Sequence, residues 1–352
     1  MLRQVTIIIN DDIVYQRTYA VGLDNSLFEN ILPNIKQEAF SRYSGEIGQF
    51  DFFKWRISFI AEKSLKLLFI FITGLADDFD RIKLELFKLK KEFLNLFGDV
   101  IKNFGRSLIF EVIDPIVDVI HRNLKPKISL VGFSGVGKTT ITKLIRSEEI
   151  PMTHIPTITG DVSSIKIGNL YFNLWDFAGQ EQFSFLWNKF IRESDAVLLI
   201  TDSSLSGIEK SKFFLELINE EAPYAHSAII ANKQDLPGAL NAATIERMLG
   251  LKAYSMIAID PGNKNKMIQI IADILEMNHE VSPLLKPLFE RDKMILEAQN
   301  SIERGDYDQT VILFEKIGDV CIDIGDDSLG YEFKEKSENL KKALSLRRDT
   351  FR

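Results

Sequence analysis

Residues 132–139 read Gly-Phe-Ser-Gly-Val-Gly-Lys-Thr, the spacing G-x-x-x-x-G-K-[ST] of a loop that can surround phosphate groups. Glycines let backbone N–H groups turn toward phosphate oxygens, and the N-terminus of a following helix adds the positive end of its dipole. Lys138 can reach the β- and γ-phosphates of a nucleoside triphosphate, and the Thr139 hydroxyl can ligate Mg²⁺. The phosphate-binding residues that we expect here are Gly132, Phe133, Ser134, Gly135, Val136, Gly137, Lys138, Thr139 and Thr140.

A second motif, residues 175–181, follows an alternating apolar run and reads Trp-Asp-Phe-Ala-Gly-Gln-Glu. Asp176, at the end of a predicted strand, can hold Mg²⁺ through a water molecule. Gly179 can offer its N–H to a γ-phosphate, and Gln180 can orient an attacking water as the catalytic residue. Between the two motifs, Thr157 is the candidate first-switch residue, with a hydroxyl for Mg²⁺ and an N–H for the γ-phosphate.

A third motif, Asn232-Lys233-Gln234-Asp235, follows a buried apolar run and indicates which base is bound. The Asp235 carboxylate can accept hydrogen bonds from the N1–H and 2-amino groups of guanine. Adenine lacks this donor pair and would leave the carboxylate unpaired, which disfavours an ATP-driven enzyme. Lys233 would lie over the base plane, and Asn232 would join this loop to the phosphate loop.

Taken together, residues 127–277 resemble the small GTPases, and more closely the Arf-like branch. The resemblance is carried by "GKTT", "HIPTI", the "WD" before the second switch, "NKQDLPGALNAA" and the short segment from Thr157 to Asp176. It implies GTP or GDP as ligand, Mg²⁺ as cofactor, slow GTP hydrolysis, and protein partners that act as exchange factors, activating factors and effectors. A structural GTP-binding subunit with permanently bound nucleotide is the alternative.

Three positions depart from the pattern of this family. Ser134 stands where Ras-type relatives carry Gly and Arf-type relatives carry Asp, and Ala178 makes the second switch Ala-Gly-Gln. The last guanine-contacting loop reads Ile257-Ala258-Ile259 rather than Ser/Thr/Cys-Ala-Lys/Thr. Ala258 can still give its backbone N–H to the guanine oxygen, although fewer side chains would support the loop.

Residues 1–126 predict an α+β domain without catalytic residues. The expected order is a hairpin over residues 1–20, a helix capped by Asp24 or Ser26, strands at 47–53, 55–61 and 67–73, a helix after Asp78, and a helix over 107–124. This order, with the opening "IIINDDIVYQRTY", resembles a longin domain of trafficking proteins.

After a break at Lys125-Pro126-Lys127, strands and helices alternate to about residue 277, which predicts a mostly parallel sheet with helices on both faces. Beyond it we expect helices over 291–304, 307–324 and 329–346, of which "RGDYDQTVILFEKI" resembles part of a tetratricopeptide repeat. The fold class is therefore an α/β phosphate-loop GTPase over 127–278, with an N-terminal longin-like domain over 1–126 and a C-terminal α-helical segment over 279–352.

Composition and charge limit the partners and the location that we expect for the protein. The 352 residues carry a net charge of −7 and no basic stripe, so we expect no nucleic-acid partner. The longest uncharged apolar run, residues 67–76, is too short for a bilayer span. We therefore expect a cytoplasmic protein whose membrane contact, where it occurs, is peripheral and made through a partner. The single cysteine, Cys321, is expected to be a packed thiol.

The helix predicted over 107–124 leads almost directly into the first strand of the GTPase domain and is apolar on much of its surface. One interpretation is that it belongs to the core of the longin-like domain. The other is that it also packs near the hairpin over residues 162–174, and so makes a contact within the chain between the two domains. In Arf-like proteins this hairpin changes register with the nucleotide state.

Overall fold

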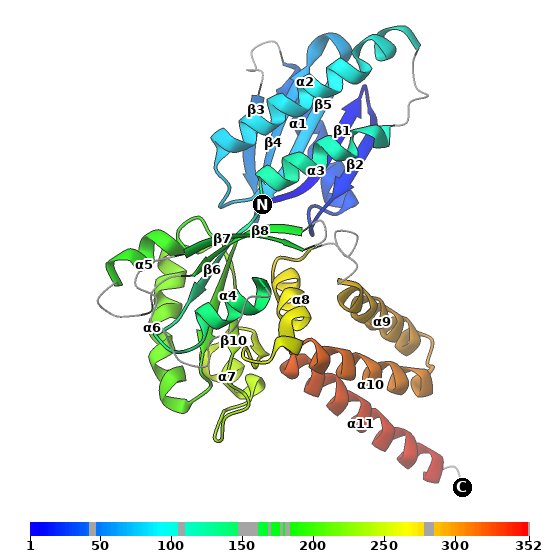
Figure 1. Cartoon of the computed structure of the whole chain (residues 1–352). Coiled ribbons are helices and arrows are strands. Elements are labelled where there is room, and N and C mark those ends of the chain that lie inside the picture. Colours follow the sequence, from blue (N-terminus) through cyan, green and yellow to red (C-terminus); the bar gives the residue numbers. More distant parts are fainter. Residues whose placement is uncertain are drawn as a thin grey trace.

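The computed structural model describes residues 1–41, 47–104, 110–146, 161–167, 170–176, 179, 184–277 and 285–350. Three parts follow one another along the chain, with the N-terminal domain and the C-terminal helices on different sides of a central domain, the one for which the sequence predicts a GTPase (Figure 1).

The N-terminal domain is a five-stranded antiparallel sheet covered by helices on both faces. Its strand order is β2-β1-β5-β4-β3. Its elements are β1 (Leu2–Ile9), β2 (Asp12–Thr18), α1 (Asn25–Phe40), β3 (Ile47–Phe52), β4 (Trp55–Glu62), β5 (Leu67–Gly74), α2 (Phe79–Phe104) and α3 (Asp114–Asn123). This is the order of elements expected from the sequence.

The central strand β5 shows why the sheet needs two helical layers. Phe69 and Phe71 belong to the core that contains α2 and α3, and the Phe69 and Phe93 rings meet edge to face with 5.3 Å between centroids. Leu68 and Ile70 point to the opposite core, which contains α1. Because successive strand residues face opposite sides, a run of large apolar residues must be buried from both.

The start of α3 differs from the expectation from sequence. The structure begins this helix at Asp114, after a short 3₁₀ turn at Phe110–Ile113, and not at Ser107, which lies outside the described residues. Pro115 stands in the first turn, where its missing N–H costs no helical hydrogen bond. The proline therefore favours the beginning of a helix at this point rather than its continuation.

The GTPase domain contains a six-stranded sheet of order β11-β10-β9-β6-β8-β7, in which only the β7–β8 pair is antiparallel. Helices α4 and α8 cover one face, and α5, α6 and α7 cover the other. The elements are β6 (Lys127–Val131), α4 (Lys138–Arg146), β7 (Asp161–Ile167), β8 (Leu170–Asp176), α5 (Ser184–Ile191), β9 (Ala196–Thr201), α6 (Leu205–Glu221), β10 (His226–Ala231), α7 (Ala242–Leu249), β11 (Ala253–Ser255) and α8 (Lys264–Ile274). The expected doubly covered, mostly parallel sheet is confirmed.

The N-terminal domain packs directly on the GTPase domain. One apolar cluster runs without a break from α2 and α3 to Ile165 and Phe172 of the β7–β8 hairpin. The Asn173 N–H donates to the Pro126 carbonyl at 2.9 Å, and Lys125 Nζ donates to Ser164 Oγ at 2.5 Å. A contact within the chain is therefore present, and its hydrogen bonds to the hairpin come from Lys125 and Pro126, which follow α3.

A second part of this interface lies at the end of α8. Glu276 accepts hydrogen bonds from Arg3 Nη1 at 3.0 Å and Lys54 Nζ at 2.9 Å, and its carbonyl accepts the Val21 N–H at 2.8 Å. The Met1 α-amino group lies between the carboxylates of Asp77 and Asp195, which belong to different domains.

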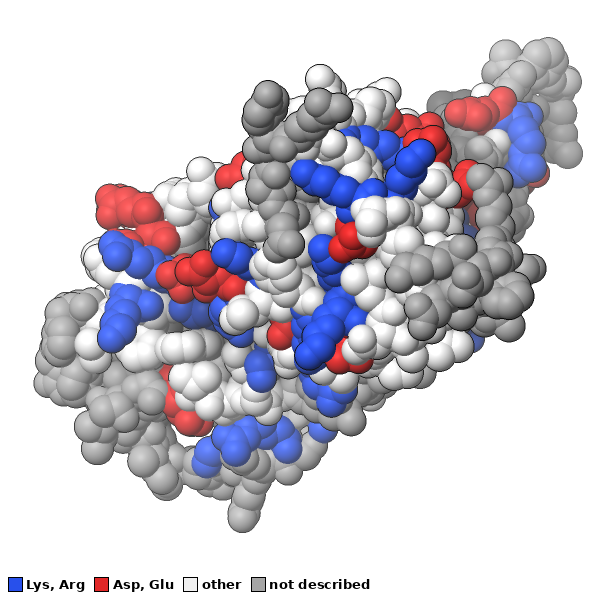
Figure 2. Space-filling model, turned by 90° about the horizontal axis from the view of Figure 1, so that it is seen from above, with Lys and Arg blue, Asp and Glu red and all other residues white. Residues whose placement is uncertain are grey.

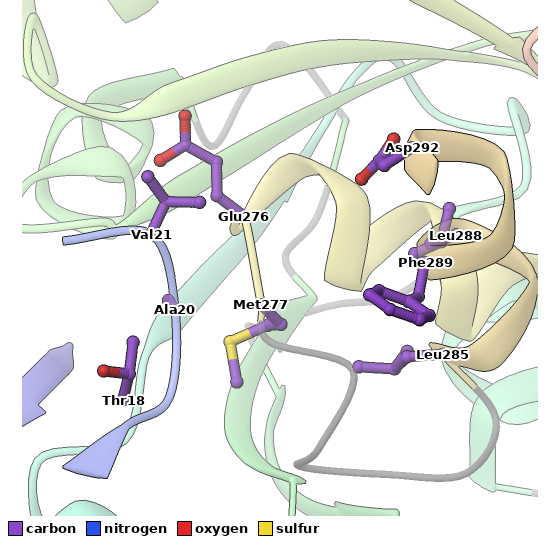
Figure 3. Close-up of a pocket in the computed structure, with 9 residues that line it drawn as sticks. All are labelled: Thr18, Ala20, Val21, Glu276, Met277, Leu285, Leu288, Phe289 and Asp292. Carbon is purple, nitrogen blue, oxygen red and sulfur yellow. The ribbon is translucent and has the colours of Figure 1, made fainter. Parts of the chain in front are cut away.

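The C-terminal segment consists of α9 (Lys286–Glu303), α10 (Tyr307–Asp323) and α11 (Asp327–Thr350). Helix α9 begins five residues before the expected Arg291, with Pro287 in its first turn. Its small core includes Cys321, whose burial raises the pKa of the thiol to about 12, as expected for a packed cysteine. A pocket of about 250 Å³ marks the place where the three parts meet, between Ala20, Met277 and Phe289 (Figure 3).

On the face seen in Figure 2, Lys and Arg side chains are interspersed with Asp and Glu side chains and with uncharged areas. Within the described ranges, none of the helices combines the length and the apolar character needed to cross a bilayer.

Candidate nucleotide-binding site

The phosphate loop connects β6 to α4 and depends on its glycines. Gly132 has a φ of 141° and Gly137 a φ of 109°, a region that residues with side chains rarely adopt. A Cβ at Gly132 would collide with the Ile200 carbonyl oxygen, and one at Gly137 with Nδ2 of Asn232. The loop therefore holds its N–H groups in a turn that only these residues permit.

Lys138 begins α4 and folds back over this loop. Its Nζ donates to the Gly132 carbonyl at 2.7 Å and to the Phe133 carbonyl at 2.9 Å. The side chain is buried, and desolvation lowers the pKa of the ammonium group to about 8 although the Asp176 carboxylate opposes this shift. A phosphate group would supply the negative charge that this buried ammonium lacks.

Asp176, at the end of β8, has the properties of a metal-binding carboxylate. It is 2% exposed, and its burial raises its pKa although a hydrogen bond with Thr139 and the charge of Lys138 lower it. Within the described part of the chain, its buried Oδ1 has no hydrogen-bond partner. A carboxylate oxygen without a partner beside a threonine hydroxyl is a donor set that fits Mg²⁺.

Gly179 lies directly against the phosphate loop. Its carbonyl accepts the Ser134 N–H at 2.9 Å, and a Cβ at this position would collide with the Gly132 carbonyl and Lys138 Nζ. The structure thus brings the second motif onto the loop. Thr157 and Gln180, and with them the first-switch and water-orienting predictions, lie outside the described residues.

Asn232 ties the base-side motif to the phosphate loop, as the sequence predicted. The side chain is 3% exposed, and its Nδ2 donates to the Val136 carbonyl at 2.9 Å. Its backbone carbonyl accepts the Ser203 hydroxyl at 2.6 Å, and this hydroxyl also accepts Gln234 Nε2 at 2.8 Å. Lys233 follows with a φ of 61°, a left-handed conformation of the kind that concentrates at functional sites.

Asp235 follows Asn232 by three residues and is exposed. Ala258, in the loop after β11, is 2% exposed, and its N–H donates to Asn232 Oδ1 at 3.0 Å. Asn232 therefore joins the Ala258 loop to the phosphate loop, through Oδ1 on one side and Nδ2 on the other.

Sequence reasoning missed the residues that support the loop at 257–259. Asn263 Nδ2 donates to the Ile257 carbonyl at 3.0 Å, and the Asp260 N–H donates to the same oxygen at 3.2 Å. Asp260-Pro261-Gly262-Asn263 is strong turn chemistry, and it was the one local signal that could have pointed to this support.

Trp187, in the apolar run after the second motif, is a core residue. Trp187 is 2% exposed and packs against Phe133 of the phosphate loop, with 6.2 Å between ring centroids. Phe214 of α6 lies 5.0 Å from the same phenylalanine ring. The phosphate loop thus rests on an aromatic cluster that reaches α5 and α6.

A glycine loop with a buried lysine, an acidic residue at a strand end and an Asn-Lys-x-Asp loop at the same sheet edge define a phosphate-loop protein of the guanine-nucleotide-binding class. The family model of the ADP-ribosylation factor family matches residues 114–288. ADP-ribosylation factor-like protein 5 of Caenorhabditis elegans is 37% identical over 131 residues, which cover 36% of this chain and 73% of that protein. ADP-ribosylation factor 1 of Brassica rapa is 36% identical over 135 residues, which cover 38% of this chain and 74% of that protein. The chain belongs to the ADP-ribosylation factor family, whose members are GTP-binding small GTPases.

Among solved structures, this chain is similar to a small GTPase of Trypanosoma brucei with a bound nucleotide analogue. The two are 21% identical, the matched part covers 43% of this chain and 97% of that one, and the TM-score is 0.37.

Proposed function

We propose that this protein is a GTP-dependent molecular switch with slow intrinsic hydrolysis. The observation that supports it best is the hydrogen bond from the Ser134 N–H to the Gly179 carbonyl. A γ-phosphate in the loop competes for the same N–H, so Gly179 must rearrange when GTP replaces GDP. Two alternative partners for one donor give the two states that a switch requires.

The chain's own residues then have distinct roles. Lys138 binds the β- and γ-phosphates, Asp235 recognises the guanine edge, and Gln180 orients the attacking water. Thr139 and Thr157 would hold Mg²⁺ through their hydroxyls and Asp176 would hold it through a water, and the ion would neutralise charge on the phosphate oxygens.

The second candidate is a structural subunit with permanently bound nucleotide. The observation that favours it is the close packing of the C-terminal helices against β11, next to the guanine loop, because a loop held in place slows the release of nucleotide.

For either role we expect the N-terminal domain to act as a longin-like module and the C-terminal helices as a tetratricopeptide-like appendage. Exchange factors, activating factors and effectors would be the protein partners. We expect a cytoplasmic protein involved in trafficking or in the assembly of membrane-associated complexes, with membrane contact made through a partner.

Base choice tests the nucleotide assignment. The wild-type protein should bind GDP and GTP far more tightly than ATP in a fluorescent-nucleotide competition assay, because only guanine offers two donors to Asp235. Asp235→Asn should shift the preference toward xanthine nucleotides, whose 2-oxo group accepts from the new amide. Equal competition by ATP and GTP would contradict the assignment.

Turnover of the same preparation separates the switch from the structural subunit. We expect single-turnover GTP hydrolysis on the order of 10⁻⁴ s⁻¹ without a partner, as for unaided small GTPases. Gln180→Leu should slow it further at unchanged GTP affinity. Absence of nucleotide exchange, or a rate of GTP hydrolysis that is the same in wild type and Gln180→Leu, would favour the structural subunit. Ser134→Gly shows whether the serine side chain hinders hydrolysis, because it removes that side chain from beside the γ-phosphate.

A further inference from the structure

The turn between α10 and α11 lies against β11, the edge strand of the GTPase sheet. The Ser255 N–H donates to the Gly325 carbonyl at 2.8 Å, and the Ser255 hydroxyl donates to Asp327 Oδ1 at 3.1 Å. The turn therefore takes a backbone donor that a further strand would otherwise take. Residues 70 and more positions apart in the chain meet here through backbone as well as side chains.

The same turn also holds the beginning of β11. Lys252 Nζ forms an ion pair with Asp326 Oδ1 at 2.5 Å, and the Asp326 side chain is 2% exposed. Lys266 of α8 also donates to Ser255 Oγ, at 3.4 Å. Buried charges that are paired in this way fix the geometry of the groups that they join.

Beyond β11, a chain of hydrogen bonds leads to the phosphate loop. Met256 donates its N–H to the Ala231 carbonyl at 2.9 Å, and its own carbonyl accepts the Gln234 N–H at 3.3 Å. Ala258 then contacts Asn232, whose side chain reaches Val136. The α10–α11 turn is thus joined to the nucleotide site through a three-residue strand and the loop that follows it.

We infer that the turn at Gly325–Asp327 is a positioning element of the guanine loop, and that the C-terminal helices thereby set the rate at which guanine nucleotide is released. The inference rests on the proposed function, because it requires that the 257–259 loop faces the 6-oxo group of guanine. Ile257 and Ile259 offer no polar side chains to steady this loop, and the turn supplies part of that support from outside the GTPase domain.

Two glycines provide a matched pair of variants. Gly325 has a φ of 85°, and a Cβ there would lie 2.9 Å from the Ser255 carbonyl oxygen and 2.6 Å from Lys266 Cε. Gly305, in the turn between α9 and α10, has a φ of 74°, and its Cβ would meet no heavy atom within 4 Å. Both substitutions to alanine impose similar backbone strain, but only Gly325→Ala pushes a turn away from β11.

The experiment measures dissociation of fluorescent GDP from the full chain. We expect Gly325→Ala to release GDP about tenfold faster than wild type. A change of this size corresponds to the loss of one hydrogen bond, here the bond between the turn and β11 that positions the guanine loop. Gly305→Ala should release GDP at the wild-type rate. Asp327→Ala, which removes the acceptor of the Ser255 hydroxyl, should give an intermediate rate and serves where Gly325→Ala does not fold. Equal rates in Gly325→Ala and Gly305→Ala, or in Asp327→Ala and wild type, would overturn the inference.

Nucleotide analogues distinguish a specific effect on the position of the 257–259 loop from a general loss of contacts with the guanine base. The affinity ratio of GDP to 6-thio-GDP reports the contact at position 6, whereas the ratio of GDP to IDP reports the contact of Asp235 with the 2-amino group. Gly325→Ala should lower the first ratio and leave the second unchanged. A fall in both ratios would contradict the inference that the turn positions the guanine loop. Failure of the wild-type protein to bind any guanine nucleotide would reject the proposed function itself.

Discussion

His121, a residue remote from the nucleotide site, contributes to the pH dependence of stability. It lies on α3 with its ring stacked on that of Tyr19, with 3.8 Å between centroids and 2° between planes. The side chain is 1% exposed, and burial, assisted by nearby positive charge, lowers its pKa to about 3. His121 is therefore neutral in the folded protein at any pH near neutrality.

The sign of the pH effect follows from this lowered pKa. The unfolded chain takes up a proton at His121 below about pH 6.5, whereas the folded chain does so only near pH 3, so stability is full above 6.5 and decreases as the pH falls between these values. At pH 5 the loss is about 2 kcal/mol. His121→Phe keeps the aromatic stack without titrating, so urea unfolding at pH 7 and pH 5 should show a smaller loss in the variant. Equal losses would contradict this assignment.

At the same scale, the sequence was sufficient where a residue belongs to a motif. The phosphate-loop glycines follow from the spacing of their own motif, and the link from Asn232 to the loop follows from a second motif, although its partner Val136 lies far away in the chain. Glu276, His226 and Gly325 gave no such signal, because their partners lie far away in the chain and only the packing of whole domains brings them together. His226 Nε2, for example, lies 2.8 Å from Arg3 Nη2.

At the scale of elements, the hydrophobic pattern predicted the order of strands and helices of the N-terminal domain, and the errors fall at helix ends. Pro115 and Pro287 each stand in the first turn of a helix whose start the sequence reading misplaced. Apolar spacing alone does not define a boundary where apolar residues continue on both sides of it.

The β7–β8 hairpin is the element through which the N-terminal domain could sense nucleotide. Its Asn173 N–H bonds to the Pro126 carbonyl, so a change in hairpin register would break this bond. Hydrogen exchange at Asn173 and over residues 114–124 should therefore differ between the GDP form and a form with a non-hydrolysable GTP analogue. The β10 amides, at the centre of the sheet, are the internal control.

Identical protection of the hairpin in both nucleotide forms, together with a normal response around Gly179, would show that the N-terminal domain is a passive neighbour. That result would leave α3 as a core helix of its own domain only.

At the scale of the whole molecule, Glu276 connects the domains through Arg3 and Lys54. Glu276→Ala removes the carboxylate partner of Arg3, whose side chain is 5% exposed, and should destabilise the docked arrangement by about 2 kcal/mol. Glu221→Ala is the control, because its partner Arg192 is 68% exposed and such surface pairs contribute about 0.5 kcal/mol.

Hydrogen exchange under mild denaturant measures this effect. In Glu276→Ala the β1 and β5 amides should lose protection at lower urea than the β9 and β10 amides, whereas in wild type and Glu221→Ala the two sheets should respond more nearly together. Joint loss of protection in all three proteins would show that Glu276 does not control docking.

Only Lys125 and Pro126 stand between the last turn after α3 and the first strand of the GTPase domain. A tether this short holds the N-terminal domain at an effective concentration on the order of millimolar beside its docking surface. An interface too weak to survive between separate chains would therefore remain closed here, and dilution in the cell would not open it. Opening becomes a unimolecular event whose frequency is independent of protein abundance, so two cells with very different amounts of this chain would have the same fraction of it undocked.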